Sequence, residues 1–319
     1  MNNDTYNRIQ AINIDTGEVL GTAYIKTNGS EELILKTERK RVLTPEQRMF
    51  LNNKNEFKNQ CKELGGFVHM IYAKNELLFN SLGIDKANVS RIIYLATYLD
   101  YSQDGLLIMK HRDVDGRFIA NAPMTRKEMQ KVLNLGNTAF RSFLKNMKEN
   151  ELLFELDKTF LVNTNYFIKG KVNIDNEQKN YCRLFIDTIR QLYEGCDARK
   201  HKTLANVYQL IPFVHYSNNL ICHNPNALQD KIRVMSLKEI GELLNIQSDK
   251  NGNLKRLSRE LSNFYITVNN KKLQLFKHYY DDDGFDAYFI NPYVVYSGNN
   301  VAKLRWIADT YFFRNSLSL

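Results

Sequence analysis

In the middle of the chain, apolar residues recur every three to four positions. This helical spacing predicts two short helices that meet at a tight turn. Thr125 and Glu128 have the spacing of a capping box, which satisfies two backbone amides at a helix start. The first helix is expected to stop at residues 134–136, and the second to begin at residue 137 or 138. Residues 152–162 form two apolar runs around a polar tip, which predicts a β-hairpin.

The same pattern occurs a second time. Residues 235–246 align without a gap on residues 124–135, and Ser236 with Glu239 repeats the capping box. A basic amphipathic helix is predicted at 254–262, after an inserted segment at 248–253. The flanking matches are Tyr101-Ser102 with Tyr216-Ser217, Leu107-Ile108 with Leu220-Ile221, and residues 160–163 with 288–291. We therefore predict two copies of one module.

A few further elements surround the two modules. Two short strands are predicted within residues 9–25, and a helix is expected to begin at Pro45, because proline favours the first helical position. The other predicted elements are helices at 67–82, 87–99 and 178–194, a hairpin at 106–120, a polar linker at 171–177 and a helix in the C-terminal tail.

Helix, tight turn, helix and hairpin, in this order, are typical of a winged helix-turn-helix. The predicted fold is α+β and mainly helical, with two tandem winged helix-turn-helix domains related by internal duplication, an N-terminal β-hairpin and a C-terminal helix. The predicted domains are an N-terminal β-hairpin and charged arm (1–60), winged-helix domains at 61–175 and 176–300, and a C-terminal helical tail (301–319).

Charge and cysteine content narrow the choice of partner. The chain of 319 residues has 44 lysines and arginines against 35 aspartates and glutamates, and its net charge of +9 favours a polyanion. No apolar run is long enough for a membrane span, and residues 1–10 lack the pattern of a secretory signal, so we expect a cytoplasmic protein without a membrane partner. The four cysteines form no CxxC pair, which predicts reduced, mostly buried thiols.

The outer sides of the two second helices carry the candidate DNA-binding residues. In a winged helix the second helix enters the major groove and the hairpin lies against the DNA backbone. In the first module we predict base-edge contacts for Asn137, Thr138 and Arg141, and phosphate contacts for Lys145, Lys148 and Lys158. In the second module the corresponding residues are Lys255, Arg256 and Arg259.

The two modules differ in charge at the hairpin tip. The second tip contains three consecutive aspartates at residues 281–283, and these would be repelled by DNA phosphates. We expect this hairpin either to stay away from DNA or to face a protein partner. A metal-dependent nuclease centred on residues 281–286 is a further alternative, although the spacing does not fit a calcium loop and a solvated turn explains these residues.

The sequence motifs of several catalytic classes are absent from the chain. It has no GxxxxGK[ST] phosphate loop and no HExxH or GxSxG motif. None of its six histidines forms the His-hydrophobic-His pair of rolling-circle nickases. We expect no enzymatic activity, no cofactor and no bound metal.

Several segments resemble the RepL-type plasmid replication proteins of Firmicutes and related winged-helix replication proteins of phages. The similarity lies in IDTGEV near the start, in Gly66-Phe67-Val68, in TRKEMQKVLNL with the basic helix after it, and in FLVNTNYFIKG. It covers residues 9–175, with residues 200–298 as a diverged second copy. The resemblance implies origin binding in plasmid or phage replication, without catalysis by the protein itself.

The resulting hypothesis is a sequence-specific, double-stranded DNA-binding protein that acts as a plasmid or phage replication initiator or origin-binding protein. One alternative is a transcriptional regulator or repressor that uses the same winged helices. Another is a protein-interaction module. Besides DNA, the partners considered are host replication proteins, a protein that contacts the acidic second hairpin, and a second copy of the chain in a homodimer.

Overall fold

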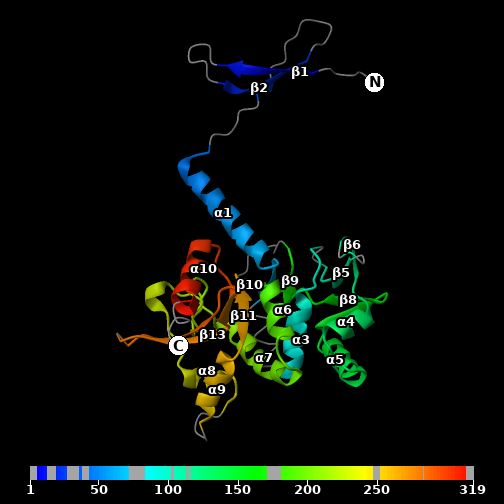
Figure 1. Cartoon of the computed structure of the whole chain (residues 1–319), viewed down its shortest axis with the longest axis vertical. Helices are drawn as coiled ribbons and strands as arrows, with labels where there is room; N and C mark the ends of the chain where they lie inside the picture. The colour runs from blue at the N-terminus through cyan, green and yellow to red at the C-terminus, as the bar shows by residue number, and fades with distance from the viewer. Residues whose placement is uncertain are drawn as a thin grey trace. The chain divides into compact units, whose positions relative to one another are not determined.

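The computed structural model describes the backbone of residues 6–12, 19–26 and 36–37, and both backbone and side chains of residues 43–71, 83–101, 104–112, 115, 117–170, 181–246, 252–282 and 284–313. The chain forms two compact units, Met1–Asn53 and Lys54–Leu319 (Figure 1). Each unit is described by itself below.

The N-terminal unit contains a three-stranded antiparallel sheet in the order β1-β2-β3. Its strands are β1 (Tyr6–Ile12), β2 (Val19–Lys26) and β3 (Lys36–Thr37), and the pairing of β1 with β2 confirms the predicted hairpin. Helix α1 (Pro45–Glu63) begins at the predicted proline. Thr44 caps this helix, because its hydroxyl accepts from the amide of Gln47 at 3.2 Å while its own amide donates to the Gln47 side chain at 3.1 Å.

The main unit is built around a four-stranded antiparallel sheet in the order β15-β10-β4-β9. Its strands are β4 (Phe67–Ile71), β9 (Phe167–Ile168), β10 (Tyr181–Phe185) and β15 (Val295–Tyr296). We call residues 67–168, from β4 to β9, the first half, and residues 181–296, from β10 to β15, the second half. The two central strands come from different halves, so backbone hydrogen bonds join the halves directly.

Two sequence predictions are corrected by this sheet. The helix predicted at 67–82 begins as strand β4, and residues 72–82 lie outside the described part of the chain. The helix predicted at 178–194 is strand β10 followed by helix α6 (Ile186–Glu194). Strand β4 is buried almost throughout and shows no period-two alternation, whereas β10 alternates between half-buried and buried positions over only its first four residues. An apolar run of this kind that leads into a helix is easily interpreted as one longer helix.

The sheet is symmetric about its central pair of strands. His69 on β4 lies opposite Arg183 on β10. His69 also pairs with Ile168 on β9, and Arg183 pairs with Tyr296 on β15. Each half therefore contributes one inner and one outer strand in the same register.

Three helices pack side by side on this framework (Figure 1). They are α3 (Lys86–Ala96), α6 and α7 (His201–Gln209). Helix α3 confirms the helix predicted at 87–99, although it ends earlier. The aromatic rings of Tyr94, Tyr193 and His201 form a stack with centroid separations of 4.1 Å, and the Ser90 hydroxyl donates to the His201 carbonyl at 2.7 Å. A continuous apolar core extends through both halves.

The first half continues with the predicted hairpin, helix, turn, helix and hairpin. The elements are β5 (Ile108–Arg112), β6 (Phe118–Pro123), α4 (Arg126–Val132), α5 (Asn137–Glu149), β7 (Leu153–Leu156) and β8 (Thr159–Val162). The capping box of Thr125 and Glu128 is present at the start of α4. Asn134 supplies the left-handed backbone conformation of the turn, with φ of 51°.

The second half contains the same helix, turn, helix and hairpin with one addition. Its elements are α8 (Leu237–Leu243), α9 (Asn253–Ser262), β11 (Tyr265–Val268), β12 (Lys271–Gln274), β13 (Phe276–Tyr280) and β14 (Asp286–Ile290). Short helical turns lie at η1 (Ala198–Lys200), η2 (Ile211–Phe213) and η3 (Gln229–Lys231). The hairpin β11–β12 was not predicted. Helix α10 (Val301–Ile307) and the π-helical segment η4 (Ala308–Phe313) follow β15.

Backbone hydrogen bonds repeat between the halves at matched positions. Leu107 donates to Phe160 at 2.9 Å in the first half, and Ile221 donates to Tyr288 at 2.8 Å in the second. These pairs correct the upstream sequence alignment by one residue, because Leu107 corresponds to Ile221 and not to Leu220. The downstream alignment is consistent with them, since it matches Phe160 with Tyr288.

A second set of matched hydrogen bonds connects these strands to the following helices. Met124 donates to the Leu107 carbonyl at 2.8 Å, and Met235 donates to the Ile221 carbonyl at 3.1 Å. The turn after α8 also repeats, since Asn245 has φ of 58°. The protein is thus a mixed α/β structure of helices and small antiparallel sheets, and its two halves share a detailed local geometry.

Candidate nucleic-acid interface

Helix α5 is amphipathic and presents one polar side to solvent. Its apolar side buries Phe140, Phe143, Leu144 and Met147. A hydrogen bond from the Asn88 side chain on α3 to the Asn146 side chain, at 3.2 Å, orients the helix against α3. The residues between these buried positions therefore form an exposed strip along the helix.

The three residues predicted to contact base edges lie at the exposed N-terminal end of α5. Asn137 accepts a hydrogen bond from the Gln130 side chain at 2.8 Å, which fixes its amide against α4. In the part of the chain that the structure describes, neither the Thr138 hydroxyl nor the Arg141 guanidinium has a hydrogen-bond or ion-pair partner. Arg141 can therefore present all its donors to a ligand.

The three lysines predicted to contact phosphates differ in how free they are. Lys148 forms an ion pair with Glu155 on β7, and Lys145 lies 3.7 Å from Glu149 one helical turn away. Lys158 occupies the exposed tip of the β7–β8 hairpin, where φ is 67°. The preceding residue also has positive φ, as expected for the two-residue turn that favours hairpins. The structure therefore leaves Lys158 freer than Lys148.

The predicted residues of the second half lie on helix α9. Lys255, Arg256 and Arg259 are exposed, while Leu257 and Leu261 face the core. Arg256 is 3.5 Å from Glu260. No ion pair engages Lys255 or Arg259 among the described residues. Two cationic side chains of α9 thus remain available to an anionic partner.

The structure exposes further basic residues that sequence reasoning missed. Lys127 and Lys131 project from α4, next to the turn that leads into α5. Lys271 and Lys272 lie on the unpredicted hairpin β11–β12, where Asn269-Asn270 forms the turn with positive φ at both residues. Asparagine tolerates the left-handed conformation that a two-residue hairpin turn requires, so Asn269-Asn270 between alternating apolar runs could have indicated the hairpin.

The acidic tip of the second hairpin is organised by contacts within the hairpin. The Asp281 carboxylate accepts from the Phe285 amide at 2.9 Å and so closes the turn. Asp286 lies 2.7 Å from His278 across the two strands. Asp283 lies outside the described residues. Among the described residues, no group of three or more histidine, cysteine, aspartate or glutamate side chains could hold a metal ion.

Both capping boxes are supported by a histidine. Nε2 of His111 lies 3.7 Å from Glu128, and Nε2 of His223 lies 2.9 Å from Glu239. Hydrogen bonds from the amide and hydroxyl of Ser236, together with His223, lower the pKa of Glu239 to about 2. Partial burial acts to raise the pKa of Glu128, but hydrogen bonds from Thr125 outweigh it and the pKa is lowered. Both carboxylates therefore stay charged and keep the helix starts fixed.

The four cysteines lie inside or at the edge of the main unit. Cys61, Cys182 and Cys222 are buried, Cys196 is partly buried, and none of the four forms a disulfide. Burial raises the pKa of the Cys222 thiol to about 11, although it neighbours His223 in sequence. The thiol therefore stays protonated at neutral pH.

Comparison with known proteins gives no relative for this chain: no family model, no curated protein and no solved structure matches it. No helix among the described residues combines the length and apolar character that crossing a bilayer requires.

Proposed function

We propose that the chain is a sequence-specific, double-stranded DNA-binding protein with two winged helix-turn-helix modules that arose by internal duplication. The observation that carries the proposal is the repeated arrangement of capped helix, left-handed asparagine turn, basic helix and hairpin. It occurs in both halves, with matched backbone hydrogen bonds. A winged helix uses this arrangement to insert its second helix into the major groove.

The free cationic side chains of α5 supply the recognition chemistry. Arg141 is exposed and unpaired among the described residues, and an arginine fork reads guanine O6 and N7 by two parallel hydrogen bonds. Thr138, three residues before it, lies on the same helical side. Lys158 at the hairpin tip fits a backbone phosphate, as expected for a wing.

The second half is proposed to bind DNA mainly through α9. Lys255 and Arg259 are the cations of this helix without an ion pair among the described residues, whereas the β13–β14 hairpin ends in Asp281 and Asp282. Phosphates repel such a tip, so DNA contact by the second wing is not part of the proposal. A tandem pair of modules in one chain addresses two half-sites or two adjacent grooves.

Origin binding in plasmid or phage replication is the proposed task, on the basis of the resemblance to RepL-type replication proteins. A transcriptional regulator with the same DNA-binding surface is the second candidate, and the position of the bound site separates the two. The acidic tip of the second hairpin favours an additional protein contact at that tip, with a host replication protein as the candidate partner.

The proposal is tested by selecting bound fragments from the replicon or phage genome that encodes the chain and footprinting them at near-physiological salt. One discrete site with two protected patches is expected. A site beside an origin supports replication, and a site at a promoter supports regulation. Recovery of random fragments only, or of none, would overturn sequence-specific binding.

Arg141 provides a sharper test on the selected site. Arg141→Ala should weaken specific binding by about 1–3 kcal/mol and change binding to random DNA much less. Arg141→Lys is the matched control, because it keeps the charge and loses the fork. Equal losses on specific and random DNA for Arg141→Ala, or full activity of Arg141→Lys, would remove Arg141 from base recognition.

A further inference from the structure

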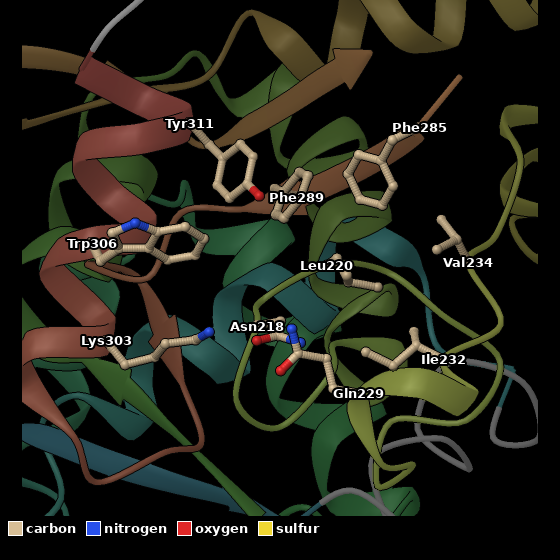
Figure 2. Close-up of a pocket in the computed structure, with 10 residues that line it drawn as sticks. All are labelled: Asn218, Leu220, Gln229, Ile232, Val234, Phe285, Phe289, Lys303, Trp306 and Tyr311. Carbon is tan, nitrogen blue, oxygen red and sulfur yellow. The ribbon is translucent and has the colours of Figure 1, made fainter. Parts of the chain in front are cut away.

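A pocket lies between the β13–β14 hairpin, the segment before α8 and the C-terminal helix α10 with η4 (Figure 2). Its volume is about 240 Å³. Phe289 lies on β14, and Phe285 directly precedes this strand. Ile232 and Val234 come from the segment before α8. Trp306 comes from α10, and Tyr311 comes from η4. Three separate segments of the chain thus meet around one cavity.

Aromatic rings form much of the wall of this pocket. The Tyr311 ring stacks on Phe289 with centroids 4.0 Å apart, and it meets Trp306 edge to face at 5.9 Å and 84°. Phe285 lies 6.5 Å from Phe289 in a tilted arrangement. Faces and edges both line the space, so a flat ring that enters finds favourable quadrupole contacts in more than one direction.

Three polar side chains face the same space without a hydrogen-bond or ion-pair partner among the described residues. They are Lys303, Asn218 and Gln229, and Figure 2 shows the Lys303 ammonium directed toward Asn218. The Lys303 ammonium lies 4.8 Å from the centroid of Trp306. Within the described residues, no carboxylate pairs with Lys303 and no hydrogen bond engages the side-chain amide of Asn218 or Gln229. Apolar walls with a few convergent polar groups are typical of small-molecule sites.

The backbone beside the pocket has an uncommon conformation. Residues 308–313 form a π-helical turn, and this turn carries Tyr311. Single π-helical turns are rare and occur frequently at functional sites. The aromatic ring of Phe289 is also specific to the second half, because the first-half residue that matches it in the sequence alignment is Leu161.

We propose that this pocket binds a small aromatic carboxylate, with its ring against Tyr311 and Trp306 and its carboxylate on Lys303. The ammonium supplies a charge-assisted hydrogen bond, and the amides of Asn218 and Gln229 supply neutral donors. The volume is below the 300 Å³ or so at which drug-sized pockets begin, so the ligand has one ring or two fused rings. The pocket shares none of its lining residues with the proposed DNA-binding residues.

Trp306 makes the pocket observable in the full-length protein. It is the single tryptophan of the chain, and it is 50% exposed on the pocket wall. Its fluorescence therefore reports on this site without labelling. Phenylacetate is the probe, phenylacetamide is its neutral analogue, and cyclohexylacetate keeps the charge and loses the aromatic ring.

Saturable change of Trp306 fluorescence by phenylacetate is the expected result, with weaker binding of both analogues. Lys303→Met should weaken the binding of phenylacetate about fivefold or more, as expected for the loss of one charge-assisted contact. It should leave the affinity for phenylacetamide unchanged. Lys271→Met is the matched control, because Lys271 also lies 4.8 Å from an aromatic ring but outside the pocket. Ligand-observed NMR with Trp306→Phe checks that the fluorescence change reflects binding.

Three outcomes would overturn the proposal. The first is the absence of saturable binding of phenylacetate by both fluorescence and NMR. The second is equal weakening of phenylacetate by Lys303→Met and Lys271→Met. The third is a short peptide ending in phenylalanine that binds tenfold more tightly than phenylacetate, since this would assign the pocket to a protein partner.

Discussion

Replacing His69 at the centre of the four-stranded sheet should change how stability depends on pH. The side chain is 5% exposed, and its ring is edge-on to Phe67 and Tyr181 at 5.0 and 4.8 Å. Its Nδ1 is buried without a hydrogen-bond partner. Burial, together with the positive charge of Arg183 on the neighbouring strand, lowers the pKa of His69 from 6.5 to about 4.

The direction of the effect follows from which state binds the proton first. As the pH falls below 6.5, the unfolded chain protonates His69 while the folded protein does not, so folding stability is lost. Below about pH 4 both states carry the proton and the loss stops. At roughly 1.4 kcal/mol for each pH unit, His69 lowers the free energy of unfolding by at most about 3.5 kcal/mol across this interval.

His69→Phe keeps an aromatic ring in place and removes the titrating group. Urea unfolding of both proteins at pH 7.5, 6, 5 and 4 measures the difference. We expect the stability of the variant to fall less steeply between pH 6.5 and 4. His278→Phe, which removes a histidine from the second hairpin, is the control. If His69→Phe and the unmodified protein lose stability in parallel over this range, the burial argument is wrong.

Two further variants test other parts of the structure. Glu155→Gln releases Lys148 from its ion pair, so binding to random DNA should tighten and its salt dependence should steepen, by up to about one unit in the log–log slope, in a titration against salt. Gly105→Ala should lower stability by about 2 kcal/mol or more in thermal or urea unfolding, because φ is +78° and the new Cβ would lie 2.1 Å from the Val162 carbonyl oxygen. Gly136→Ala, which meets open space, should cost much less and is the control. A loss no larger for Gly105→Ala than for Gly136→Ala would contradict the steric argument.

Local signals in the sequence located the elements of the proposed interface. Thr125 and Ser236 each precede a glutamate by three residues, and both capping boxes are present in the structure. The start of α5 and the hairpin around residue 157 were also predicted, because helix caps and two-residue turns depend on a few neighbouring residues. Whether these elements bind DNA stays a prediction.

Features that depend on distant segments were not predictable in the same way. Strand β4 is paired by strands that begin at residues 167 and 181, and no local pattern indicates such partners. The pocket around Trp306 depends on the approach of three separate segments, so the sequence indicated only an apolar tail. Ion pairs between elements, such as that of Lys148 with Glu155, likewise depend on how the helix and the strand pack, which the sequence pattern does not specify.

The central strand pair also determines what each half would do if it were separated from the other. Strands β4 and β10 are each five residues long, and removal of either half would leave a bare edge of amides and carbonyls on the remaining one. A second copy of the same half offers a matching edge, so isolated halves should form isologous dimers. Such dimers would place His69 opposite His69, or Arg183 opposite Arg183. Two guanidinium groups opposite each other repel, so self-association of the second half is less favourable than pairing of β10 with β4. The charge at this position thus favours the pairing within one chain.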